Sequence, residues 1–130
     1  MKKIFTIILA LCAILTLSAC DDNSEIKQIK KGCVRAIEIG QQYLDFEISK
    51  AEAILLLGDI EDLIDPMMDD EEERLEEEYE KNKLDGIYDS SELCDFLGAH
   101  RAINYLAWNI SHDNYTSILD DIQDLQEYVK

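Results

Sequence analysis

The fold is decided by the stretch SKAEAILLLGDIEDLI at residues 49–64. Ser49 is followed three residues later by Glu52, which is the capping-box pattern that opens helices. The apolar residues that follow cover more than one side of a helix, and such a helix must be covered on several sides. We therefore expect a helix over residues 50–64 that is the most buried helix of the protein.

The residues on either side of this stretch predict two further helices. Over residues 25–47, apolar residues recur at three- and four-residue steps, which places them on one helical face. After residue 64, Asp65-Pro66 predicts a break, because proline begins helices well and interrupts them elsewhere. A helix over 66–84 would start there. Its thin apolar stripe and stacked like charges predict a surface helix of low stability.

The rest of the chain predicts two more helices, over residues 90–109 and 115–129. The segment 84–88 is expected to be a loop, and 111–114 a polar turn. No stretch of the chain predicts a strand. Short connections favour antiparallel neighbours, so we expect an all-α fold, a small antiparallel bundle of four to five helices.

The start of the chain has the pattern of an export signal. Lys2 and Lys3 precede an apolar segment over residues 4–17, and Leu17-Ser18-Ala19-Cys20 follows it. This pattern resembles the lipobox of bacterial lipoproteins. The resemblance implies a signal peptide over 1–19 and a lipid on Cys20. The alternative is a transmembrane helix, but a span needs about 20 apolar residues.

The resemblance also implies a domain organisation and a location. Residues 20–24 would be the lipidated cysteine and a short tether, and 25–130 a single helical domain. The protein would be anchored to the membrane in the bacterial cell envelope. Asp21-Asp22 resembles the signal that retains lipoproteins in the inner membrane of Gram-negative bacteria, facing the periplasm.

The charge balance bears on the class of partner. The chain has 12 basic and 29 acidic side chains, a net charge of −17. Nucleic acid is excluded as a partner, because binding phosphates needs a basic surface. The charge favours a basic protein partner or cations, or it serves only solubility. The most acidic run comprises Asp69, Asp70, Glu71, Glu72, Glu73, Glu76, Glu77, Glu78 and Glu80. We expect it to be either a partner-binding face or simply a solvated one.

Two cysteines of the expected domain, Cys33 and Cys94, predict an interhelical disulfide, since an exported domain meets oxidising conditions. The alternative is two buried thiols. We expect no metal, because the two cysteines and the two histidines, His100 and His112, lack metal-ligand spacing. His100 is expected to be a core or rim residue. Trp108 is expected in the core, with an interface role as the alternative.

No catalytic motif is present, so we expect no enzyme, no cofactor and no small-molecule substrate. We consider three functions. The first is a lipid-anchored binding module for a basic protein, with a toxin inhibitor as one concrete version. Its plan resembles the small, exported, disulfide-bearing helical immunity proteins of interbacterial amidase toxins in size, export, helicity and acidity. The second is a structural envelope lipoprotein acting as a scaffold subunit. The third is a weakly cation-responsive module.

Overall fold

The computed structural model describes residues 25–130 and is helical throughout that range, apart from the connections. Its four helices are α2 (Glu25–Leu44), α3 (Lys50–Leu84), α4 (Ser91–Ser111) and α5 (Tyr115–Val129). The all-α prediction is confirmed, with four helices in the described part of the chain. The predictions for the signal peptide 1–19, for Cys20 and for the tether 20–24 lie outside the described residues.

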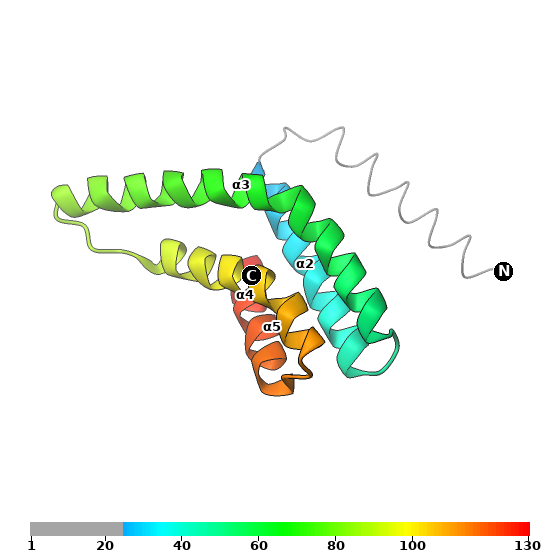
Figure 1. Cartoon of the computed structure of the whole chain (residues 1–130). Helices are drawn as coiled ribbons and strands as arrows, with labels where there is room; N and C mark the ends of the chain where they lie inside the picture. Colours follow the sequence, from blue (N-terminus) through cyan, green and yellow to red (C-terminus); the bar gives the residue numbers. More distant parts are fainter. Residues whose placement is uncertain (1–24) are drawn as a thin grey trace.

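The helices enclose one apolar core, and Figure 1 shows their arrangement. α3 packs against α2 and α4, α5 packs against the same two helices, and α2 also contacts α4. α3 and α5 do not contact each other. Each helix contributes fully buried side chains, among them Ile29 from α2, Ile64 from α3, Phe96 from α4 and Leu125 from α5.

α3 begins at the predicted capping box. The Ser49 hydroxyl accepts a hydrogen bond from the backbone N–H of Glu52 at 3.2 Å. In return, the Ser49 backbone N–H donates to Oε2 of Glu52 at 2.8 Å. Two backbone N–H groups at the helix start are thereby satisfied, which fixes where α3 begins.

The predicted break at Asp65-Pro66 is wrong: α3 is one helix of 35 residues that contains Pro66. A proline inside a helix leaves the carbonyl four residues earlier without its N–H donor, and it bends the helix. The ribbon of α3 changes direction about halfway along its length (Figure 1). Pro66 is exposed, and Ile64 and Met68 on either side of it are fully buried. Packing on both sides thus keeps the helix continuous.

The expectation that residues 50–64 form the most buried helical segment is also wrong. Only Ala53, Leu57 and Ile64 are buried there, whereas Leu55 and Leu63 are 67% and 63% exposed. α4 has seven buried residues among its 21. The neighbours of the two helices explain this difference, because α4 contacts all three other helices, whereas α3 contacts only α2 and α4.

The predicted disulfide between Cys33 and Cys94 is not formed, and both thiols are free. Cys33 is fully buried on the inner face of α2, whereas Cys94 is exposed in the first turn of α4. Phe96, two residues after Cys94, points into the core. Two residues correspond to about 200° around a helix, so Cys94 faces solvent. Burial raises the pKa of the Cys33 thiol to about 12.

The two thiols should therefore differ in reactivity. We expect iodoacetamide to label Cys94 in the native protein and Cys33 only after denaturation, because a covered, protonated thiol is a poor nucleophile. Mass spectrometry of the labelled peptides checks both sites. If neither cysteine is labelled after denaturation without reductant, the two are bridged and the free-thiol arrangement is contradicted.

Candidate functional site

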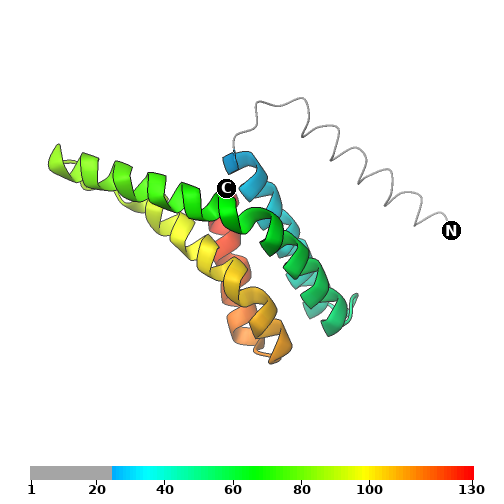
Figure 2. The ribbon, with the colours of Figure 1, turned by 45° about the horizontal axis from the view of Figure 1, so that its top comes forward.

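The most acidic part of the protein is the far end of the α3–α4 pair, residues 69–95, which we call the acidic hairpin. It carries 13 acidic and three basic side chains. α3 extends to this end beyond α2 and α5, and α4 begins beside it but short of its tip (Figure 1, Figure 2). None of residues 76–95, all within the described range, is buried. The acidic hairpin therefore projects into solvent without a core of its own.

The nine acidic residues of the predicted partner-binding face do not share one face of α3. They fall within twelve residues, so at 3.6 residues per turn they surround the helix. Glu71 is buried and Glu72 is half-buried. The remaining seven are exposed: Asp69, Asp70, Glu73, Glu76, Glu77, Glu78 and Glu80.

Glu71 is buried because Arg74 compensates its charge. Arg74 donates from Nε to Oε2 of Glu71 at 2.9 Å and from Nη2 to Oε1 at 2.7 Å. Its third nitrogen, Nη1, donates to Oε2 of Glu78 at 2.7 Å. The hydrogen bond to Glu71 raises the pKa of Arg74 above its ordinary value, so the guanidinium stays charged. One arginine thus neutralises the buried carboxylate and holds an exposed one.

Glu72 contributes to the contact between α3 and α4. Its Oε2 lies 2.6 Å from Nδ1 of His100 on α4, and Nε2 of His100 lies 3.8 Å from Oδ1 of Asp69. The His100 side chain is largely covered. His100 is therefore a rim residue that connects two helices, as the sequence predicts.

Two carboxyl groups nearer the middle of α3 are less well accommodated. Glu61 and Asp65 each have one buried oxygen without a hydrogen-bond partner. Burial, followed by the charges of Asp65 and Asp62, raises the pKa of Glu61 to about 7. Burial also raises the pKa of Asp65, although His100 opposes this shift. Ionisation of these groups destabilises the fold.

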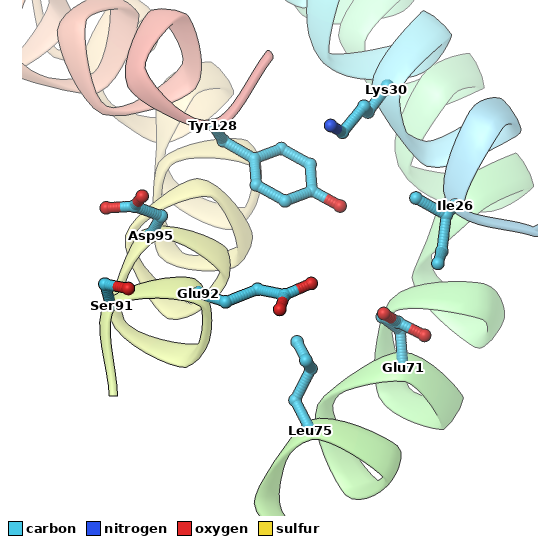
Figure 3. Close-up of a pocket in the computed structure, with 8 residues that line it drawn as sticks. All are labelled: Ile26, Lys30, Glu71, Leu75, Ser91, Glu92, Asp95 and Tyr128. Carbon is cyan, nitrogen blue, oxygen red and sulfur yellow. The ribbon is translucent and has the colours of Figure 1, made fainter. Parts of the chain in front are cut away.

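A cavity of about 240 Å³ opens at the base of the acidic hairpin, where all four helices meet (Figure 3). The carboxylates of Glu71 and Glu92 and the ring of Tyr128 point into it. The cavity is lined by Ile26, Lys30, Glu71, Leu75, Ser91, Glu92, Asp95 and Tyr128.

A second cavity of about 230 Å³ lies next to the first, between the end of α3 and the start of α4. The two cavities are neighbours that share Leu75, Ser91 and Glu92 as lining residues, and we call them together the hairpin groove. The second cavity adds Glu78, Tyr79, Asn82, Ile87, Asp89 and Leu93 to its lining.

The charges in the hairpin groove are unevenly compensated. Arg74 neutralises Glu71, and Lys30 lies over the ring of Tyr128, with Nζ 5.4 Å from the centroid. Burial and then the nearby Cys33 raise the pKa of the Tyr128 hydroxyl, so it stays protonated. Glu92 and Asp95 form no ion pair with any residue of the described range. The groove therefore has two carboxylates outside any ion pair of the described range, beside apolar side chains.

Sequence reasoning missed this groove. Ile26, Glu92 and Tyr128 come from three different helices and are far apart in the chain. Helical periodicity could have placed Ile26 and Tyr128 on inner faces. Only the packing of the helices shows that they line the same cavity.

Trp108 is 54% exposed, so its expected place in the core is wrong. It stacks on His112, with the ring centroids 4.0 Å apart. Leu97 and Tyr105 are exposed on the same side of α4, at steps that return to one helical face. α4 thus presents a separate aromatic surface, away from the hairpin groove.

The described part of the chain shows no arrangement of three or more histidine, cysteine, aspartate or glutamate side chains suited to a metal ion. Within the same range, no helix is long and apolar enough to cross a membrane. No protein-family model matches this chain, and neither a curated protein nor a solved structure is detectably similar to it.

The raised pKa of Glu61 predicts how stability depends on pH. The carboxyl has a folded-state pKa of about 7 against an ordinary value of 4.5, so its favourable contribution is complete below pH 4.5 and is lost as the pH rises through 7. Glu61→Gln should raise the free energy of unfolding by about 1–2 kcal/mol at about pH 8. This gain is smaller than the pKa shift alone implies, because Glu61 is partly exposed and water screens its charge.

Urea unfolding of the wild type and of Glu61→Gln at about pH 8 and about pH 4 checks this expectation. The exposed Glu73→Gln is the matched control and should change stability by less than about 0.5 kcal/mol at either pH. A gain from Glu61→Gln that is equal at both pH values would show that the ionisation of Glu61 does not destabilise the fold.

Proposed function

We propose that this protein is a lipid-anchored, acidic helical binding protein of the bacterial cell envelope that engages a basic protein partner through the acidic hairpin. One observation carries the proposal. The acidic hairpin, residues 69–95, has 13 acidic and three basic side chains, and none of residues 76–95 is buried. A complementary basic surface gains attraction and fast association from such a field.

The exposed carboxylates suit a partner better than they suit the fold. Glu71 and Glu72 have structural partners in Arg74 and His100. In contrast, Glu73, Glu76 and Glu77 are exposed, and none of them forms an ion pair with a residue in 25–130. Like charges three or four residues apart destabilise a helix slightly. The stability of the fold therefore does not explain why these three glutamates are present.

The lipobox-like residues 17–20 support an anchor for this binding module at the membrane, with the lipid on Cys20. In a Gram-negative host the proposed location is the inner membrane, facing the periplasm. A specific form of the proposal is an immunity-type inhibitor, in which the acidic hairpin covers a basic surface of a toxin. No catalytic role is proposed.

A second function, a scaffold subunit of an envelope assembly, is favoured by the aromatic surface of α4. Leu97, Tyr105 and Trp108 are exposed on one side of that helix, and aromatic residues are enriched in interface cores. A scaffold would use this surface together with the acidic hairpin, and several proteins would then be retained with it.

Lipid attachment is tested at Cys20. Cys20→Ser should abolish incorporation of radiolabelled palmitate and leave an uncut precursor, because the thioether requires the Cys20 sulfur. Cys12→Ser, also within the expected signal peptide, is the matched control and should be labelled and processed normally. Labelled, membrane-bound Cys20→Ser protein would contradict the lipoprotein interpretation.

The role of the acidic hairpin is tested by removing exposed charge only. A variant with Asp70→Asn, Glu73→Gln, Glu76→Gln and Glu77→Gln should associate about tenfold more slowly with the basic protein that crosslinks to the wild type in membranes, at low salt. The difference should shrink as salt rises, since charge steering is screened over ~8 Å at physiological ionic strength. Stopped-flow association at several salt concentrations measures both effects.

The control removes the same number of charges elsewhere: Asp45→Asn, Glu47→Gln, Asp59→Asn and Asp120→Asn, all at exposed positions. It should associate nearly as fast as the wild type. Equal rates for all three proteins would show that the acidic hairpin is only a solvated surface. Equal slowing of both variants would assign the effect to net charge alone.

A further inference from the structure

We infer that the hairpin groove receives a basic amphipathic helix of the partner protein, with apolar side chains of that helix against the groove floor and a lysine or arginine against Glu92, whose carboxylate points into the cavity (Figure 3). This inference rests on the proposed function and specifies the site and the partner chemistry. It starts from the composition of the groove, which is neither purely acidic nor purely apolar.

The floor of the groove is apolar and uncovered. Leu75 marks the last buried position of α3, and beyond it Tyr79 and Leu93 are only half-buried. Ile87, in the connection between α3 and α4, is 52% exposed. These side chains would be covered if a further helix lay between α3 and α4, as in the helix-in-groove mode of recognition.

The rim of the groove determines the charge of the occupant. Glu78 and Glu71 are already held by Arg74, and Asp89 accepts hydrogen bonds from the backbone N–H and the hydroxyl of Ser91. Glu92 and Asp95 form no ion pair among the described residues, and Lys30, which lines the same cavity, lies over the ring of Tyr128. An apolar helix that covered them without a cation would desolvate two carboxylates at a large cost.

Other occupants fit less well. A second copy of this chain would bring its own 13 acidic side chains against the same 13. Nucleic acid is repelled by the same charge. A small cation would satisfy Glu92 and Asp95 but would leave Leu75, Ile87 and Leu93 uncovered. Only a helix with one apolar and one basic side satisfies both parts of the groove.

The experiment uses a synthetic helical peptide of roughly 14 residues, or four turns, with leucine on one face and lysine on the flanks. One control peptide has every leucine replaced by alanine, which keeps the charge and the helix propensity. Binding to the lipid-free protein is measured by calorimetry at low salt. Backbone amide shifts should change mainly within residues 75–95.

Two single variants test the two halves of the groove, each with a matched control. Ile87→Ser should weaken binding of the leucine–lysine peptide by about fivefold to thirtyfold, and Glu92→Gln by about twofold to tenfold. Leu63→Ser and Asp59→Asn, exposed apolar and acidic positions of α3 outside the acidic hairpin, should stay within about twofold of the wild type.

The outcomes separate this inference from the function on which it rests. Equal binding of both peptides, with no effect of Ile87→Ser, would overturn the groove site but leave the acidic hairpin as an electrostatic surface. Absence of binding by either peptide at low salt would overturn both. Self-association that Ile87→Ser abolishes would assign the groove to a second copy and would also overturn the inference.

Discussion

The length of α3 is the constraint on which the rest of the structure depends. At 1.5 Å per residue, its 35 residues extend about 52 Å, whereas the 20 residues of α2 extend about 30 Å. α2 can therefore cover only part of α3. The uncovered end has α4 as its sole neighbour, and two helices without a third cannot enclose a core. The acidic hairpin and its half-open groove follow directly from this mismatch in length.

The helical period places the carboxylates of α3 in two groups, one on the inner side of the helix and one on its outer side. On the inner side of α3, Glu71 and Glu72 have Arg74 and His100 as partners, so they fasten the hairpin. On the outer side, the carboxylates are solvated and available to another molecule. Under the proposed function, the same twelve residues would serve both the fold and the partner.

The sequence predicts the helical class, the capping box of α3 and the bounds of α5 well, because these depend on local patterns. Its errors occur where tertiary packing decides. Pro66 predicts a break by local rules, but the buried Ile64 and Met68 hold the helix together across it. The pattern places Cys33 and Cys94 on two different helices and predicts a disulfide between them. In the structure, Cys94 lies in the first turn of α4 and faces solvent, whereas Cys33 is buried.

The same contrast between local pattern and tertiary packing applies to the candidate site. The acidic run is evident in the sequence because it is a local concentration of charge. The hairpin groove is not, because Ile26, Glu92 and Tyr128 come from helices whose packing no local signal specifies. Even the acidic run was predicted as one face, and only the three-dimensional arrangement separates Glu71 from its exposed neighbours.

The position of the groove bears on the proposed lipid anchor. Ile26 and Lys30 line the first cavity, and α2 begins at Glu25. Five residues, 20–24, reach at most about 18 Å when extended, so a lipid on Cys20 would keep the base of the groove near the bilayer. With that anchor, anionic head groups would attract Lys27 and Lys31 and would repel the acidic hairpin. In this arrangement the base of the groove stays close to the membrane while the tip points away from it. A basic helix arriving from solvent would meet the acidic tip first and then slide along the groove towards Glu92.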